Sequence, residues 1–412
     1  MSELHSARVT TALIPRYVSR FGCIGAACED NCCTGWAVSI DKKTFKAYRQ
    51  VKNKELGNSL SENVQRRRSQ ETNADYARIQ LHAETKACPL MRDNLCAVQK
   101  NLGESYLSNT CFTYPRVSRK FAGQYELALT LSCPEAARQA LLVEDAFEFV
   151  EAPVKLRDNV VAEVAPRLGM PLELMNEVRI FCIQLLQTQG LALWEKLAVL
   201  GGFCEGLTAT LAESGNAAVP ALMEEYVAIV EQGLVGDALA KLQPDYAAQA
   251  QIFALLWQFK ATATGSAVQK SVSEAVSQGL GANGETGQLG SERLVENYSR
   301  GIERLHKALE ATPRLLEHYI LNEMFLELFP FGGASPYEDY LKLISRFGLL
   351  RLMLAAQCNA NATLPDAVAL SNTVQVYCRR FQHDPNFAQQ VSQVLNNSGW
   401  GKLEKLYRFL RS

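Results

Sequence analysis

The chain has 412 residues, with 42 Lys and Arg against 43 Asp and Glu, and 48% of its residues are hydrophobic. This composition is typical of a globular protein long enough for two or three domains, and it excludes a disordered or fibrous chain. No run of about 18 apolar residues occurs, and the first ten residues lack the layout of a secretory signal. We therefore expect a soluble, cytoplasmic protein that has no membrane partner.

Basic residues and cysteines are concentrated in the first third of the chain. Residues 1–135 hold 19 basic and 13 acidic side chains, so the remainder is acidic, and eight of the 12 cysteines lie in the first 133 residues. The run from Arg66 to Arg68 lies in a polar stretch, which we interpret as solvated surface rather than a patch for an acidic partner. We expect no nucleic-acid partner.

The first third predicts short strands and loops. Residues 36–40 form a brief apolar run, and Asp41 follows as the N-cap of a helix that continues through Tyr48. Residues 74–81 roughly alternate between polar and apolar side chains, and residues 125–131 are the best strand candidate.

After Cys133 the pattern changes to helices. Pro134 occupies a first helical position and begins a helix predicted to continue to residue 150. Helical periodicity then recurs in residues 172–186, 191–211, 222–234, 247–259, 293–309, 314–328, 337–354, 367–381 and 403–410. Almost nothing in this part of the chain favours strands.

The sequence therefore predicts a mainly α protein in two parts. Residues 1–135 form a cysteine-rich metal domain of loops and short strands, and residues 136–412 form a helical domain with a Gly- and Ser-rich loop or linker near 261–290. No strand precedes the glycines of that loop, so we interpret it as a linker rather than a nucleotide-binding turn. These glycines are Gly279, Gly281, Gly284, Gly287 and Gly290.

Eight cysteines form the most informative pattern. They are Cys23, Cys28, Cys32, Cys33, Cys88, Cys96, Cys111 and Cys133. Most lie beside Gly, Pro or turn residues, where thiolates can converge on a metal at about 2.3 Å from each sulfur. Such density in a reducing compartment indicates metal binding or redox chemistry. We expect the adjacent Cys32 and Cys33 to point in different directions, so that at most one of them binds in a given four-ligand site.

The identity of the metal depends on spacing and on ligand type. A structural zinc site favours C-x2-C pairs, and none occurs, while the nearest histidine is His82, for which we expect a surface or core role. The all-sulfur, widely spaced set favours an iron–sulfur cluster, with zinc as the alternative. Cys182, Cys204, Cys358 and Cys378 lie in helical patterns and are predicted to be ordinary buried residues.

These segments resemble the flagellin lysine-N-methylase family of bacteria, and the resemblance extends over nearly the whole chain. The segments that carry it are FGCIGAACEDNCCTGW, CPLMRDNLC, LGESYLSNTCFTYPR, LTLSCPEAAR and YILNEMFLELFPF. The resemblance implies methyl transfer from S-adenosylmethionine to surface lysines of flagellin, with a protein-bound iron–sulfur cluster, expected to be 4Fe–4S, in or near the active site. It also implies that a subset of the eight cysteines holds this cluster.

Lysine methylation needs a neutral amine, because a protonated ammonium has no lone pair with which to attack the methyl group. Tyr114 and Arg116, which follow Cys111, are our candidate catalytic residues, and Arg116 is suited to a carboxylate such as that of the cofactor. The alternative is that Tyr114 packs against the cluster and Arg116 forms a structural ion pair. Glu323 and Glu327 are one helical turn apart and could face a pocket, although an exposed helix face is the better expectation. Phe329 and Phe331 are predicted to be core residues.

A second class of function stays open at this point. The cysteine-rich region could instead be a non-enzymatic module that chelates iron or zinc, or senses redox state, while the helical region binds a protein partner. The sequence indicates neither the oligomeric state nor which cysteines share a site.

Overall fold

The computed structural model describes residues 4–69, 72–258, 265–282, 291–382, 394–395 and 399–411. Contacts within the chain divide it into two compact units. The first comprises Met1–Gln139, Glu148–Val164 and Thr264–Gln269, and the second comprises Ala140–Phe147, Ala165–Ala263 and Lys270–Ser412. The described residues are mainly helical, and their strands belong to the first unit. Most of these strands lie before residue 135, as predicted, and two of them, at residues 149–156 and 162–163, lie after it.

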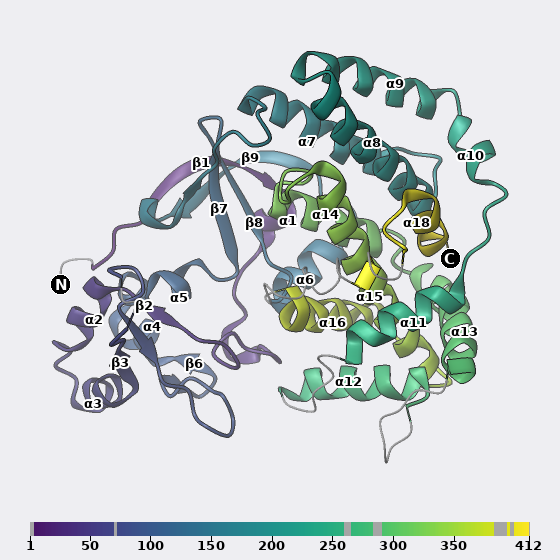
Figure 1. Ribbon diagram of the computed structural model, residues 1–412. Coiled ribbons are helices and arrows are strands. Elements are labelled where there is room, and N and C mark those ends of the chain that lie inside the picture. Colours follow the sequence, from purple (N-terminus) through teal and green to yellow (C-terminus); the bar gives the residue numbers. More distant parts are fainter. Residues whose placement is uncertain are drawn as a thin grey trace. The chain divides into compact units, whose positions relative to one another are not determined.

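The first unit contains a five-stranded sheet in the order β10-β7-β8-β1-β9 (Figure 1). Its strands are β1 (Arg8–Pro15), β7 (Arg116–Phe121), β8 (Gln124–Leu129), β9 (Phe149–Leu156) and β10 (Ala162–Glu163). β1 pairs in parallel with β8 and antiparallel with β9 along its whole length. β7 and β8 form a hairpin around Ala122 and Gly123, which both have positive φ, as a tight two-residue hairpin turn requires.

Smaller elements complete the first unit. Two further sheets contain β2 (Ser39–Ile40), β4 (Ala77–Ile79) and β3 (Val64–Arg66), and β5 (Met91–Arg92) with β6 (Leu95–Cys96). The helices are α1 (Tyr17–Arg20), α2 (Lys42–Tyr48), α3 (Lys54–Asn63), α4 (Ala97–Leu102), α5 (Asn109–Thr113) and α6 (Pro134–Leu141), with 3₁₀ turns η1 (Gly25–Ala27), η2 (Glu104–Tyr106) and η3 (Asp158–Val160). The predicted cap of α2 is confirmed, since the Asp41 carboxylate accepts from the Thr44 backbone N–H at 2.9 Å.

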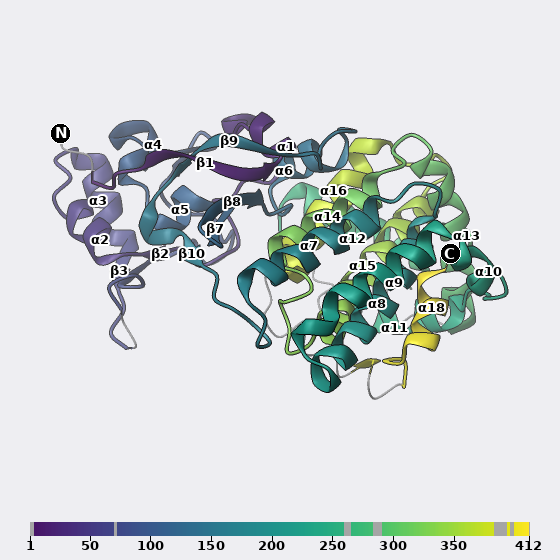
Figure 2. The ribbon, with the colours of Figure 1, turned by 90° about the horizontal axis from the view of Figure 1, so that it is seen from above.

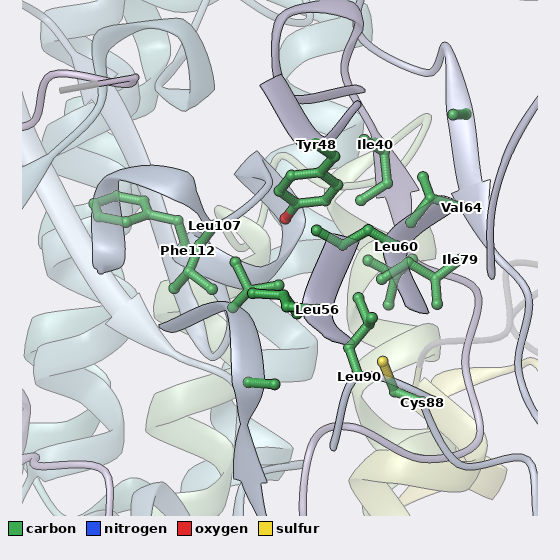
Figure 3. Close-up of a cluster of buried hydrophobic side chains, with 14 residues drawn as sticks. Ile40, Tyr48, Leu56, Leu60, Val64, Ile79, Cys88, Leu90, Leu107 and Phe112 are labelled. Carbon is green, nitrogen blue, oxygen red and sulfur yellow. The ribbon is translucent and has the colours of Figure 1, made fainter. Parts of the chain in front are cut away.

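A hydrophobic cluster joins these small elements to one another. α3 contributes Leu56 and Leu60, and β4 contributes Ile79 (Figure 3). Cys88 is part of the same cluster, and its sulfur lies at one end of it beside Leu90 (Figure 3). The cysteine-bearing segments are therefore fastened to a packed core rather than to solvent-exposed loops alone.

The helix predicted from Pro134 to residue 150 is wrong in its second half. α6 ends at Leu141, and residues 149–156 form β9. The sequence FVEAPVKL alternates between more and less buried positions, and Pro153 is incompatible with a helix interior. An edge strand tolerates this proline, and β9 lies at the edge of the sheet.

The second unit is a helical assembly (Figure 2). Its helices are α7 (Leu172–Gln187), α8 (Leu193–Glu213), α9 (Val219–Glu231), α10 (Leu234–Leu239), α11 (Tyr246–Gln258), α12 (Ala267–Leu280), α13 (Ser291–Leu309), α14 (Leu315–Glu327), α15 (Pro336–Ala360), α16 (Ala367–Tyr377) and α18 (Leu403–Leu410), with a 3₁₀ turn η4 (Asn216–Ala218) and a π turn η5 (Cys378–Gln382). The nine predicted helical segments after residue 170 each coincide with helix in the described residues, and the last residue of the fourth, Phe259, lies outside them.

α15 is the central helix of the second unit. It packs against α8, α11 and α13, and 19 of its 25 residues are buried. Ser335 caps its N-terminus by accepting from the Glu338 N–H, and Pro336 occupies the first turn, where a missing N–H costs nothing. Such a helix, buried on all sides, forms the core on which the others pack.

The prediction of a loop or linker near residues 261–290 is wrong where α12 lies. Val272, Val276 and Leu280 lie one turn apart on its buried face, so a helical period is present within a composition rich in Gly and Ser. Gly279 belongs to this helix, where a Cβ would lie 1.8 Å from the Ala356 carbonyl oxygen, so the glycine permits close packing on α15. Residues 259–264 and 283–290, with Gly284, Gly287 and Gly290, lie outside the described residues.

None of the helices in the described ranges combines the length and the apolar character that crossing a lipid bilayer requires.

Candidate functional site

The first group of cysteines lies on an irregular loop that reaches the β5–β6 hairpin. Gly25 and Gly35 have φ of +59° and +87°, which favours glycine at both positions. A Cβ on Gly25 would lie 3.4 Å from the Leu95 side chain, which places this loop beside the residue that precedes Cys96. Two segments far apart in the sequence are thus brought together.

The second group is attached directly to the first. The Cys88 N–H donates to the Cys33 carbonyl at 2.7 Å, and Thr34 forms an isolated β-bridge with Ala87. Beyond Cys88, the hairpin places Met91 opposite Cys96. The backbone therefore holds Cys33, Cys88 and Cys96 in one neighbourhood.

Two further cysteines occupy helix starts. Cys111 lies in α5, whose N-cap Ser108 accepts from the Cys111 N–H at 3.2 Å, and Thr110 in the same helix donates to the Ser39 carbonyl of β2. Cys133 directly precedes α6, and its carbonyl accepts from the Ala137 N–H at 2.9 Å. Both thiols are thus presented at the first turn of a short helix.

The thiols interact electrostatically. Burial is the main cause of the raised pKa of Cys88 and Cys133, to about 11 in each case, and of Cys111, to about 12. Burial also raises the pKa of Cys28 and Cys96, while a hydrogen bond with Cys32 is the main cause of the raised pKa of Cys33. The charge of Cys32 contributes at all six positions, so these seven thiols lie within electrostatic range of one another.

Cys23 differs from these seven thiols. It lies exposed at the start of the first loop, and no interaction joins its side chain to another thiol in the described part of the chain. All 12 cysteines are free thiols.

The thiols are the right chemical type to bind a metal, but they are not close enough to one another to share one. Soft sulfur ligands are the donor set expected for an iron–sulfur or zinc centre. Nevertheless, no group of three or more Cys, His, Asp or Glu side chains among the described residues is positioned to hold a metal ion. Metal binding at these thiols therefore stays a prediction, and it would require them to release their protons and approach one another more closely.

The two candidate catalytic residues lie beside the cysteine segments. The Tyr114 ring packs 5.4 Å from the Trp36 ring, and Trp36 donates to the Cys32 carbonyl at 2.6 Å. The Tyr114 hydroxyl is 3.1 Å from the Ser132 hydroxyl, next to Cys133. Arg116 begins β7, with its guanidinium 5.4 Å from the centre of the Phe21 ring. These contacts connect both residues to the loops, and their catalytic roles stay predictions.

Arg157, which follows β9, belongs to this region, although nothing in the sequence around it predicted a contact with the cysteine segments. It is 1% exposed and donates to the carbonyls of Leu107 and Glu104, both at 2.9 Å. Its guanidinium also lies 3.9 Å from the centre of the Phe112 ring, next to Cys111. A buried cation thus fastens the segment before Cys111 to the end of β9, a contact that depends on the tertiary fold.

The expectation that Glu323 and Glu327 share an exposed helix face is wrong for Glu323. Glu323 is 2% exposed and pairs with Arg346 of α15 at 3.0 Å, while Glu327 pairs with Lys342 at 2.7 Å. Burial raises the pKa of Glu323, and the charge of Arg346 opposes that rise. Charges three to four residues apart in the otherwise apolar α15 were the signal that could have indicated a buried ion pair.

Other sequence predictions are confirmed. Cys182, Cys204, Cys358 and Cys378 are all buried in the second unit, and His82 is exposed. Phe329 and Phe331 are 3% and 0% exposed, as expected of core residues.

Comparison with known proteins identifies first the class and then the family. A relative named lysine-N-methylase, from Salmonella typhimurium strain LT2, is 24% identical over 388 residues, which cover 92% of this chain and 94% of the relative. A lysine-N-methylase from Salmonella choleraesuis strain SC-B67 matches with the same identity and coverage. The flagellar biosynthetic protein FliU of Salmonella muenchen is 34% identical over 152 residues, covering 37% of this chain and 89% of that protein.

These relatives indicate the class of lysine N-methylases. The family model of the FliB lysine N-methylase C-terminal domain matches residues 179–409, more than half of the chain. The chain belongs to this family, which confirms the resemblance seen in its sequence. No solved structure matches it.

Proposed function

We propose that this chain is a protein-lysine N-methyltransferase that transfers a methyl group from S-adenosylmethionine to surface lysines of flagellin. Membership of the lysine N-methylase family carries the proposal, and the flagellar name of one relative supports the choice of substrate. The 12 free thiols are compatible with work in the reducing cytoplasm.

The reaction places a simple demand on the protein. The lysine ammonium first gives one proton to water. The neutral Nζ then attacks the methyl carbon, the new N–C bond forms as the C–S bond breaks, and S-adenosylhomocysteine leaves. The methylated amine carries the positive charge that the sulfonium has lost. In this proposal the Tyr114 hydroxyl oxygen accepts a hydrogen bond from the amine and orients its lone pair.

The same proposal assigns a cluster to the gathered thiols. A subset of the seven electrostatically linked cysteines, with Cys23 as a possible eighth, would hold an iron–sulfur cluster, 4Fe–4S in the preferred form, with zinc as the alternative. A bound cluster would supply an anionic metal centre next to Tyr114 and the first loop. Trp36 and Arg157 would keep the loops that carry Cys32 and Cys111 in place around it.

The test of activity uses the full chain purified without oxygen. Incubation with flagellin and S-adenosylmethionine should increase the mass of flagellin by whole methyl groups on lysine, and flagellin with chemically blocked lysines should show no increase. If intact flagellin gains no methyl group while the protein still binds metal, the alternative of a non-enzymatic chelating module is favoured.

The test of the cluster compares two identical substitutions. Cys111→Ala should reduce the iron and sulfide content per chain, whereas Cys358→Ala, which changes a buried thiol of the second unit, should leave it unchanged. A wild-type protein that carries one zinc and neither iron nor sulfide would remove the cluster from the proposal and leave the methylation test standing.

A further inference from the structure

A basic surface lies in the first unit, on α2, on β3 and on the loop that leads from β3 into β4 (Figure 1). Residues 42–49 and 64–79 hold eight Lys or Arg side chains and two acidic ones. The exposed cations are Lys42, Lys43, Lys46, Arg49, Arg66 and Arg68. No cysteine and neither candidate catalytic residue belongs to this surface, so the proposed reaction leaves its charge without a use.

Backbone contacts bring the two basic segments together. The Lys42 N–H donates to the Asn73 carbonyl at 2.9 Å, and the Arg67 N–H donates to the Tyr76 carbonyl at 3.0 Å. The start of α2 therefore lies against the connection between β3 and β4. The run from Arg66 to Arg68, which the sequence alone favoured as solvated surface, is thus part of a larger basic surface that α2 completes.

Two aromatic rings hold cations from both segments in place. Phe45 of α2 and Tyr76, which precedes β4, pack with their ring centres 5.3 Å apart. Lys42 Nζ lies 5.5 Å and the Arg66 guanidinium 4.9 Å from the centre of the Tyr76 ring. The Arg49 guanidinium lies 4.9 Å from the centre of the Phe45 ring. Such contacts position a cation without neutralising its charge.

The counter-charge within this surface is small. Arg67 and Arg78 both pair with Asp75, so one carboxylate serves two guanidinium groups. Three further exposed cations make no ion pair with the residues that the structure describes, and these are Lys43, Lys46 and Arg68. Like charges held close together repel one another, so an anionic partner would relieve this repulsion.

We propose that the basic surface docks an acidic segment of the protein substrate. Asp and Glu carboxylates are the anions that a polypeptide offers, and Arg and Lys bind them through charge-assisted hydrogen bonds. Cations spread over a helix, a strand and a loop match several carboxylates along a chain better than they match one small anion. The inference rests on the proposed function, since it names how that reaction's protein substrate is held.

The basic surface is connected to the candidate catalytic tyrosine through β2 and α5. Arg78 lies opposite Ser39 in the three-stranded sheet, and the Ser39 carbonyl accepts from Thr110 Oγ1 at 3.3 Å. The Tyr114 N–H in turn donates to the Thr110 carbonyl at 3.2 Å. A docked acidic segment would therefore be held in the same unit as Tyr114. The basic surface repels lysine side chains, so it cannot compete for the residue to be methylated.

A nucleic acid is the other polyanion that a basic surface could attract. Proteins that bind single strands stack the bases on exposed aromatic rings. Phe45 and Tyr76 are half-buried, pack against each other and already carry the protein's own cations. This arrangement favours a polypeptide partner over a nucleic acid.

The first experiment measures binding without catalysis, by fluorescence anisotropy of a labelled oligoglutamate peptide with the full chain. Lys43→Gln/Lys46→Gln/Arg68→Gln, the basic-surface variant, should bind this peptide about 10-fold more weakly at low salt, as expected from the loss of three exposed charge contacts. Binding by the wild type should weaken as the salt concentration rises. The three side chains are exposed, so their replacement spares the core.

The matched control is Lys100→Gln/Lys270→Gln/Lys307→Gln. It removes the same number of positive charges from exposed positions outside the basic surface, so both variants have the same net charge. The control should bind oligoglutamate as the wild type does. Thermal unfolding of each variant checks that the fold is intact.

The second experiment compares the methylation of two substrates. With flagellin, the basic-surface variant should raise KM about 10-fold and leave kcat unchanged, because docking stabilises the bound substrate and the transition state equally. A short peptide with one lysine and no acidic residue should be methylated equally well by the wild type and by both variants.

Two results would overturn the inference alone. One is wild-type oligoglutamate binding and a wild-type KM for flagellin in the basic-surface variant; the other is an equal loss in the control variant, which would show a general effect of charge. Tighter binding of an oligoadenylate RNA than of oligoglutamate, lost in the basic-surface variant, would identify a nucleic-acid surface and also reject it. Oligoglutamate binding that depends on this surface, in a protein that methylates no lysine, would reject the proposed function while supporting an acidic partner.

Discussion

The two units of this chain bury reactive side chains in opposite ways. The first unit presents its cysteines on turns and helix starts, where the charge of one thiol acts on the next. The second unit places its four cysteines inside helical segments, all 0% exposed, and keeps charged pairs such as Glu323 with Arg346 in its interior.

The two units therefore differ in what their cysteines can do: those of the first unit could bind a metal, and those of the second only pack. A thiol fixed in the middle of a long helix cannot move toward other thiols without unfolding that helix, whereas thiols on turns can approach a shared metal. The helical unit instead uses buried charge, which is costly unless each charge keeps its partner. Four measurements would sharpen or break this comparison.

The largest effect is expected from the buried ion pair. Glu323→Ala leaves the Arg346 guanidinium buried without its nearest partner, and should lower the free energy of unfolding by about 3–5 kcal/mol. Glu327→Ala removes a carboxylate that is 42% exposed and lies 3.5 Å from the same guanidinium, farther away than Glu323, so it should cost less, about 1 kcal/mol. Denaturant unfolding followed by circular dichroism measures both, and equal losses would contradict the distinction between buried and exposed pairs.

His318 should make the helical unit sensitive to acid. Burial lowers the pKa of His318 to about 4, so between pH 6.5 and 4 this histidine is protonated in the unfolded chain but not in the folded one. The free energy of unfolding therefore keeps its full value above pH 6.5 and falls as the pH approaches 4. The loss assigned to this residue is about 3 kcal/mol. His318→Gln should flatten the decline between pH 6.5 and 4, and the exposed His82→Gln should not.

Thiol reactivity should separate the two sets of cysteines in metal-free protein. A pKa of about 11 at Cys88, against the ordinary value of 9.0, lowers its thiolate fraction at pH 8 about 100-fold, so alkylation by iodoacetamide should be slow and accelerate as the pH rises toward 11. Cys182 should not react until the helices unfold. Mass spectrometry of alkylated peptides reports both, and fast labelling of Cys182 in folded protein would break the comparison.

The smallest effect concerns helix contact. Gly279→Ala should cost about 1–3 kcal/mol, because its Cβ would overlap the Ala356 carbonyl oxygen of α15. Gly236→Ala, in α10 with open space around it, should instead stabilise the protein by up to about 1 kcal/mol. Chemical denaturation of the two variants gives the comparison, and a neutral Gly279→Ala would indicate that α12 and α15 can separate easily.

Sequence patterns predicted the helical unit well because its helices bury one face or all faces at a regular period. The helix around Ala367–Tyr377 was recognised from this period, and so was the capped helix after Asp41. β9 was missed because FVEAPVKL follows a genuine helix without a break, and its partner β1 is more than 130 residues away. α12 was missed because its Gly and Ser content concealed the spacing of Val272 and Val276.

The candidate site was only partly accessible to such reasoning. Residue types and local turns indicated that the eight cysteines belong together, but the contact between Cys88 and the Cys33 carbonyl joins positions 55 residues apart. Arg157 had no local signal at all, since its partners Leu107 and Glu104 are about 50 residues earlier in the chain.

The return of the chain at Glu148 has a consequence for how this protein can be divided. The first unit is interrupted by residues 140–147 and completed by β9, which pairs with the whole of β1. A fragment ending after Gln139 would leave β1 as an open edge, free to pair with other chains, and would lose Arg157 from its place beside Cys111. The thiol-bearing unit is therefore not a portable module, and any exchange of it between proteins must carry residues up to Val164 to keep all five strands of the sheet.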